Sequence, residues 1–258
     1  MNPEEQSKFA IHEAAREGRA SVVESLLNAS SPQIRYRANP QLAGLRDGDD
    51  RLPIHWAVSY NHRPVVELLV QRKNFDPDVQ DGSGWTPLMI ASSLKEGDDL
   101  VDLLLRREAD VNCKSAVNPL RPVIYPSIDP PIQTALHFCA SKNNIDVARK
   151  LLAHKASARI RDKRSQLPIH RAAAIGSVPM VKLLIENNSP LNAADISGLT
   201  PLHHAISEGH GDTALLLLKA GAETDVRDRE GQLAIDLAPD SKIRKFVLQS
   251  AEREGIEL

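Results

Sequence analysis

Histidine is the residue type in this chain best suited to acid–base catalysis or metal binding, because its pKa lies near neutrality and its ring nitrogens are good ligands. The chain has 9 histidines among its 258 residues. Five of them occupy the last position of a recurring tetrapeptide: His12, His55, His137, His170 and His203. Such regular spacing places the rings in successive layers of a repeated structure, not around one point. We therefore interpret these histidines as structural residues that bond backbone groups across a turn.

The other arrangements of chemically active residues are no better suited to catalysis. His203 and His204 are adjacent, so on a helix their side chains point about 100° apart and cannot readily share a metal ion. His137 and Cys139 are two residues apart and meet the same objection. The Gly-Ser-Gly segment at 82–84 lacks the lysine of a phosphate-binding loop, and no metalloprotease or nucleophilic-serine motif is present. The sequence predicts a protein that is not an enzyme and uses no metal and no cofactor.

The tetrapeptide recurs at a nearly constant interval. The second residues of its copies are Ala10, Pro53, Pro87, Ala135, Pro168, Pro201 and Ala234. The steps between them are 43, 34, 48, 33, 33 and 33 residues. A step of about 33 residues with a Thr-Pro-Leu-His-like marker is typical of the ankyrin repeat. The sequence therefore predicts an all-α ankyrin-repeat solenoid, whose stacked units form an extended binding surface and not an enclosed pocket.

Seven helix–turn–helix repeats with β-turn or hairpin tips are expected within a single domain, residues 1–258. Their predicted ranges are 7–30, 47–80, 81–114, 129–161, 162–194, 195–227 and 228–250. The two long steps place insertions at 30–46 and 115–131. The second insertion holds five of the chain's 17 prolines, which disfavours helix and strand and favours an extended loop. Two interpretations of that loop stay open: an arm that touches a partner, or a tolerated surface excursion.

The sixth repeat shows how local sequence specifies one unit. Asp195 and Gly198 indicate a tight turn, because aspartate can bond its own backbone and glycine tolerates positive φ. Thr200 is expected to cap a helix that begins at Pro201, where the missing N–H has no intrahelical partner. Gly221 is expected just beyond the end of the second helix. Neither helix could hold its apolar face alone, so each repeat depends on its neighbours.

Composition narrows the class of partner. The formal net charge is −2, so nothing draws the whole chain toward nucleic acid or an anionic membrane, and neither partner is expected. Only Cys113 and Cys139 are present, too few for a disulfide framework, and Cys139 is expected to fill a small core position. The first six residues are polar, and no apolar run approaches about 18 residues. We expect a cytoplasmic and nuclear protein that is monomeric when free.

Residues that the repeat does not dictate are the candidates for binding a partner protein. The turn tips and the exposed face of each first helix are expected to line a concave surface. The predicted partner-binding residues are Asp49, Arg51, Tyr60, Trp85, Lys142, Lys163, Arg164, Arg171 and Glu208. Exposed tryptophan and tyrosine near arginine are typical of binding hot spots. Trp56 is open between core and surface, and the lysines and arginines predict a basic middle that suits an acidic partner surface.

Several stretches extend beyond the general ankyrin pattern. They are residues 49–56 (Asp-Asp-Arg-Leu-Pro-Ile-His-Trp), 84–87 (Gly-Trp-Thr-Pro), 140–143 (Ala-Ser-Lys-Asn), 170–174 (His-Arg-Ala-Ala-Ala) and 208–212 (Glu-Gly-His-Gly-Asp). In these stretches, and in its seven-repeat count, the chain resembles the gankyrin family, especially its fungal members. The resemblance covers nearly the whole chain apart from the two insertions.

The resemblance implies a chaperone for assembly of the 19S regulatory particle of the proteasome. Such proteins bind the C-terminal domain of one AAA ATPase subunit through the concave face, with opposite charges paired, and hinder premature docking on the 20S core. The matching positions in this chain are Asp49, Arg51, Trp85, Lys142, Arg171 and Glu208. Reversing Lys142 and Arg171 to glutamate is expected to weaken binding without unfolding the chain. The family's Leu-x-Cys-x-Glu motif corresponds to residues 204–208, which keep only the glutamate, so the retinoblastoma-protein binding linked to that motif is not expected.

One alternative stays open at this point. The ankyrin fold alone hosts many partners, so a general adaptor or inhibitor in signalling or transcription would share the same scaffold. The two functions differ in which protein occupies the binding face.

Overall fold

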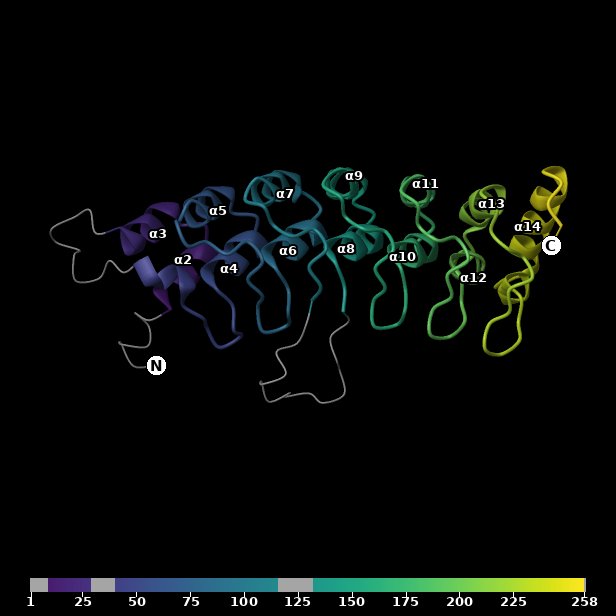
Figure 1. Ribbon diagram of the computed structural model, residues 1–258, viewed down its shortest axis with the longest axis horizontal. Helices are drawn as coiled ribbons and strands as arrows, with labels where there is room; N and C mark the ends of the chain where they lie inside the picture. The colour runs from purple at the N-terminus through teal and green to yellow at the C-terminus, as the bar shows by residue number, and fades with distance from the viewer. Residues whose placement is uncertain (1–8, 29–39, 116–131, 258) are drawn as a thin grey trace. The chain divides into compact units, whose positions relative to one another are not determined.

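The computed structural model describes residues 9–28, 40–115 and 132–257, and it is helical throughout these ranges apart from turns and loops. Contacts between residues group the chain into two compact units, residues 1–130 (unit 1) and 131–258 (unit 2). Each unit consists of paired short helices joined by turns (Figure 1). No strand occurs in the described ranges, which confirms the predicted all-α ankyrin class.

Unit 1 contains three helix pairs. They are α2 (Ala10–Arg16) with α3 (Ala20–Leu27), α4 (Pro53–Ser59) with α5 (Arg63–Val70), and α6 (Pro87–Ser93) with α7 (Asp98–Leu105). The first helices of successive pairs contact one another, and so do the second helices. In Figure 1 the long turns of this unit extend from the row of first helices.

Unit 2 repeats the plan with three helix pairs and a shorter final repeat. The pairs are α8 (Ala135–Lys142) with α9 (Ile145–Ala153), α10 (Pro168–Ala174) with α11 (Val178–Glu186), and α12 (Pro201–Ser207) with α13 (Gly211–Lys219). The last repeat has a 3-10 helix, η2 (Ala234–Leu237), before α14 (Ser241–Arg253). We number the repeats one to seven in the order of these pairs.

Packing between layers supplies the stability that such short helices lack on their own. Most of these helices have 7 to 9 residues, a length at which an isolated helix is marginal in water. Leu136, Leu151 and Leu184 are fully buried in unit 2, as Leu88 and Leu104 are in unit 1. Each full burial of a leucine contributes roughly 2 kcal/mol, so neighbouring repeats stabilise one another.

The helix boundaries follow the expected signals. Thr200 precedes α12 at Pro201, and Gly221 lies just beyond α13 with a φ of 92°. The seventh repeat departs from the pattern because Ala238 precedes Pro239, and a residue before proline is disfavoured in the α region. Its first helix therefore shortens to η2. Cys139 is fully buried, which confirms its predicted core position.

The two predicted insertions are described only in part. Residues 40–44 of the first insertion form a 3-10 helix, η1 (Pro40–Gly44), which contacts α3 and α4. Residues 29–39, and residues 116–131 of the second insertion, lie outside the described residues. Both proposals for the proline-rich loop therefore stay as predictions.

Candidate functional site

One aspartate organises each of five long turns in the described ranges. Its backbone N–H donates to the carbonyl four residues later, and its Oδ1 accepts the N–H groups two and four residues later. In the second repeat, Oδ1 of Asp47 accepts from the backbone of Asp49 and Arg51 at 2.9 Å. Asp81, Asp162, Asp195 and Asp228 make the same pair of bonds. This turn holds its exposed tip residues in a fixed conformation.

The second carboxylate oxygen of the turn aspartate binds side chains. Oδ2 of Asp47 accepts from Nε1 of Trp56 at 2.6 Å, nine residues later in the same repeat. The same nine-residue spacing joins Asp162 to Arg171, at 2.6 Å. An aspartate followed nine residues later by a side-chain donor therefore indicates a bond between a turn and its first helix, and the sequence analysis did not use this pattern. Each such pair ties a turn to its first helix.

A second type of donor comes from the preceding repeat. Nε of Arg51 donates to Oδ2 of Asp81 at 3.2 Å, and Asp81 is only 1% exposed in its side chain. Nε2 of Gln166 donates to Oδ2 of Asp195 at 2.9 Å. Arg51 and Gln166 occupy equivalent positions, two residues before the helix proline. These bonds join neighbouring turns within each unit.

In unit 1 these bonds support an aromatic surface. The guanidinium of Arg51 lies over the Trp56 ring, 4.7 Å from its centroid, which is favourable cation–π geometry. Trp56 stacks on Tyr60 with ring centroids 6.3 Å apart, and Tyr60 in turn stacks on His62. Tyr60 is 54% exposed. Trp56, which sequence left open between core and surface, is half-buried and carries this exposed ring.

The other two predicted residues of unit 1 lie at turn tips. Asp49 is exposed, and its carbonyl accepts the N–H of Gly82 from the next turn. Trp85 is half-buried, and its backbone pairs with Asp81 across the turn. The ring is thus less exposed than the sequence predicts, and its place in a partner interface stays a prediction.

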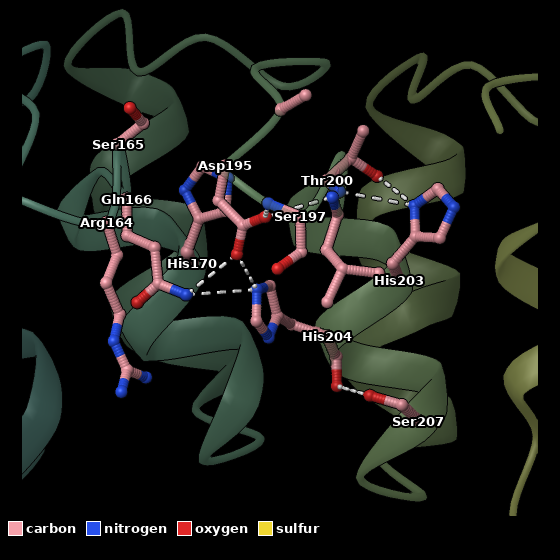
Figure 2. A network of polar contacts seen from close by, with 12 residues as sticks. Arg164, Ser165, Gln166, His170, Asp195, Ser197, Thr200, His203, His204 and Ser207 are labelled. Atoms are coloured by element: carbon pink, nitrogen blue, oxygen red, sulfur yellow. Dashed lines mark hydrogen bonds and ion pairs between the residues drawn. The ribbon is translucent and has the colours of Figure 1, made fainter. Parts of the chain in front are cut away.

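In unit 2 the turns are linked by a polar network (Figure 2). Oδ2 of Asp195 accepts from Gln166 and from Nε2 of His204, at 3.0 Å for the histidine. The ring of His204 also meets His170 edge-on, with centroids 5.7 Å apart. Burial alone would raise the pKa of Asp195, but the bonds from Gln166, His204 and the turn backbone together lower it. The carboxylate of Asp195 is thus held ionised by donors from two repeats.

The predicted charged residues of unit 2 divide into exposed side chains and one that is bonded to a buried carboxylate. Lys142 ends α8 and is exposed, and Glu208 is the exposed residue that follows α12. Arg164 is exposed at the turn of the fifth repeat, beside the exposed Lys163. Arg171, in contrast, is bonded to Asp162, whose side chain is fully buried. Its guanidinium therefore helps to hold the turn while its side chain stays 25% exposed, and its role in binding a partner remains a prediction.

The histidines of the tetrapeptide serve the backbone, as predicted. The N–H of Leu52 donates to Nδ1 of His55 at 3.0 Å, which leaves the proton on Nε2 for the carbonyl of Val79, 3.1 Å away in the following turn. His170 repeats this pattern with the backbone of Leu167 and Ala193. Both rings must be neutral to make these bonds.

Burial explains why the neutral form is favoured. It lowers the pKa of His137 and of His170 from 6.5 to about 4, and it lowers the pKa of His12, His55 and His203 as well. In the described ranges, no three His, Cys, Asp or Glu side chains are placed to hold a metal ion. Nor is any described helix long and apolar enough to cross a membrane.

Comparison with known proteins agrees with this geometry. The ankyrin-repeat family pattern, "Ankyrin repeats (3 copies)", matches residues 11–115 and 136–228. The chain belongs to the ankyrin-repeat family. Ankyrin-repeat domains of known structure share this fold: that of human ASB11 superposes with a TM-score of 0.73 over 97% of this chain and 98% of its own, at 21% sequence identity.

Two fungal relatives match over most of their length. One is "Probable 26S proteasome regulatory subunit p28" of Saccharomyces cerevisiae, 35% identical over 95% of this chain and 99% of the relative. The other is "Ankyrin repeat-containing protein C6C3.08" of Schizosaccharomyces pombe, 34% identical over 85% of this chain and 89% of the relative. The similarity to p28 confirms the resemblance to the gankyrin family.

Proposed function

We propose that this chain is an assembly chaperone of the proteasome regulatory particle. In this proposal it binds the C-terminal domain of one AAA ATPase subunit through its turn tips and first helices, and so hinders premature docking on the 20S core. The observation that carries the proposal is the similarity to yeast p28 along 95% of the chain. Such a protein would act in the cytoplasm and nucleus and would not be an enzyme.

The described surfaces support recognition of a folded protein. In unit 1, Arg51, Trp56 and Tyr60 form a stacked group with one well-exposed ring. Aromatic rings and arginine held in place by other contacts lose little entropy on binding, so they suit an interface. In unit 2, Lys142 and Arg164 offer exposed positive charge, which would steer an acidic partner surface.

The test is direct binding of the isolated C-terminal domain of the cognate ATPase to the full chain, measured by calorimetry at low salt. We expect a complex, and we expect Lys142→Glu with Arg164→Glu to weaken it about tenfold, or roughly 1.4 kcal/mol. Arg171 is left unchanged in this test because its charge is bonded to Asp162.

A matched control separates local pairing from net charge. Lys182 and Lys245 are exposed on the second helices α11 and α14. Reversing both to glutamate changes the net charge by the same amount, and this variant is expected to bind like the wild type. Failure of the wild-type chain to bind the ATPase domain would refute the chaperone function and favour a general ankyrin adaptor. Equal weakening by both variants would instead show that the interface lies elsewhere.

A further inference from the structure

The turn of the seventh repeat contains a carboxylate oxygen with no partner in the described part of the chain. Oδ1 of Asp228 accepts the backbone N–H groups of Glu230 and Gln232 at 2.9 Å, as in the other turns. No described residue donates to its Oδ2. In the other four turns Oδ2 accepts from at least one side chain. The turn of Asp228 therefore has the same backbone geometry as the other turns but lacks a side-chain donor to Oδ2.

The cause is visible in the sequence of this repeat. The two positions that supply donors elsewhere are the residue two before the helix proline of the preceding repeat, and the residue nine after the aspartate. For Asp228 these positions are Leu199 and Leu237, whose side chains have no polar hydrogen to donate. Two nearby arginines are engaged elsewhere: Arg227 donates to the carbonyl of Gly231, and Arg244 to that of Ile235. Arg229, the exposed residue that follows Asp228, also lines this region, and its side chain makes no bond to Oδ2 of Asp228.

Asp228 also lines an open hollow. This hollow, of about 550 Å³, lies between the turns of the sixth and seventh repeats and beside the end of α12. Ile196, Leu199 and Leu237 form apolar walls. The polar lining consists of Ser197, Ser207 and Gln232 together with the oppositely charged pair Arg229 and Glu230. Ile196 is 46% exposed. A long side chain with an apolar stem and a cationic end fits this combination, since its stem can lie along the leucines while its charge meets the carboxylate.

The chain itself shows which cation this turn accepts. Asp162 binds the guanidinium of Arg171 at 2.6 Å through Oδ2, and Asp81 binds that of Arg51 at 3.2 Å through the same atom. In both turns Oδ1 is already occupied by the backbone, so a single charge-assisted bond to Oδ2 is the available mode. Figure 2 shows the equivalent oxygen of Asp195 occupied by Gln166 and His204.

We propose that the hollow at Asp228 binds an arginine side chain of the partner protein, which completes in trans the bond that the other turns make within the chain. This proposal rests on the proposed function, in which the arginine belongs to the C-terminal domain of the ATPase subunit. The partner surface would therefore be mixed in charge: acidic opposite Lys142 and Arg164, and carrying one arginine at the turn of the seventh repeat.

The first test uses a small probe and needs no ATPase. N-acetyl-arginine methylamide is titrated into the full chain while amide signals are followed by NMR. We expect saturable shifts of the Glu230 and Gln232 amides, whose N–H groups donate to Asp228. The neutral norleucine analogue should cause none. Asp228→Asn should abolish the shifts, because its side-chain oxygen can keep the two turn bonds while the charge is lost. Asp225→Asn, at an exposed neighbouring carboxylate, should leave them intact.

A second variant tests the proposal through gain of an internal donor. Leu199→Arg places a guanidinium at the position from which Arg51 reaches Asp81, and Leu199→Gln copies Gln166. Both should occupy Oδ2 of Asp228 and abolish the probe-induced shifts, and a far-UV spectrum checks that each is folded. Shifts in Asp228→Asn equal to those in the wild type, or no shifts in the wild type, would overturn the site.

The second arm measures binding of the ATPase domain. Asp228→Asn is expected to weaken binding about tenfold, and Asp225→Asn less than twofold. If the ATPase domain binds but Asp228→Asn has no effect, the partner arginine is refuted while the chaperone function stands. If the domain does not bind at all, the chaperone function fails, and so does the assignment of the arginine to that partner.

Discussion

The turn of the second repeat in unit 1 and that of the fifth repeat in unit 2 share one backbone and differ in what the backbone holds. Asp47 and Asp162 accept the same two N–H groups, and each bonds a side chain nine residues later. In unit 1 that side chain is Trp56, which supports the exposed ring of Tyr60. In unit 2 it is Arg171, whose guanidinium forms an ion pair with the buried carboxylate of Asp162.

This difference separates two uses of a bond that recurs between repeats of the chain. An indole needs only one hydrogen bond to be oriented, so most of its ring area stays available for further contacts. A guanidinium bonded to a buried carboxylate is committed, because removing it would leave that charge unpaired. Identical positions in the repeat thus support an exposed aromatic ring in unit 1 and pair a buried carboxylate in unit 2.

The largest expected effect is that of acid on the buried histidines. The folded-state pKa of His137 and His170 is about 4, below the unfolded value of 6.5, so protonation favours the unfolded chain. Their contribution is complete above pH 6.5 and is lost as the pH falls from 6.5 toward 4, by roughly 3 kcal/mol for each histidine. Urea unfolding at pH 7.5, 6.0 and 4.5 measures this loss.

Two features make the acid prediction specific. The lowered pKa of Asp47 and Asp195 reduces stability mainly below pH 3.8, and the pKa of Asp78, raised by burial, would make acid stabilise the fold, so these carboxyl groups do not account for a large loss above pH 4.5. Methionine already occupies the equivalent position at Met89 in unit 1. His170→Met should therefore be less stable at pH 7.5 but lose less on acidification. A free energy of unfolding that is constant between pH 7.5 and 4.5 would contradict the neutral, buried histidines.

The next effect tests whether the arginine of unit 2 is structural. Arg171→Glu places a carboxylate against the buried Asp162 and should lower the free energy of unfolding by about 3 kcal/mol. Arg164→Glu reverses an exposed charge at the same turn and should change it by less than about 0.5 kcal/mol. Urea denaturation followed by circular dichroism compares the two. Equal stability of both variants would show that Arg171 is free to bind a partner.

The smallest effect concerns the indole of unit 1. Trp56→Phe removes the 2.6 Å bond to Asp47 and should lower the free energy of unfolding by about 1 kcal/mol. Tyr60→Phe keeps the exposed stacked ring and should have almost no effect on unfolding. The measurement is again urea denaturation. A loss as large as that of Arg171→Glu would mean that the two turns do not differ in the way proposed.

Much of the repeat is legible in sequence because its signals are local. Pro201 after Thr200, Gly198 in the turn and Gly221 beyond the helix each act within a few residues, and the helices begin and end where these signals predict. The structural role of His170 also follows from its constant place in the tetrapeptide. The repeat pattern does not predict the shortened helix before Pro239. The shortening depends on a single dipeptide, Ala238-Pro239, which opposes the helix that the repeat pattern favours.

The state of individual side chains was less predictable. Exposure was expected for both Arg171 and Trp85, and the structure shows the first bonded and the second half-buried. Whether Arg51 is a free cation depends on Asp81, thirty residues away, and no local pattern links them. The assignment of the nine predicted residues to a partner interface stays a proposal.

Sequence alone determined the ankyrin scaffold, the absence of recognisable catalytic motifs and the structural place of the histidines, because a repeated pattern states the same local requirement many times. Tertiary structure decided which carboxylates, rings and cations are already satisfied. That depends on distances between side chains of neighbouring repeats, such as the 3.2 Å from Arg51 to Asp81, and on the lack of any such donor to Oδ2 of Asp228 in the described chain. A side-chain atom is available to bind a partner only where these internal bonds leave it unoccupied.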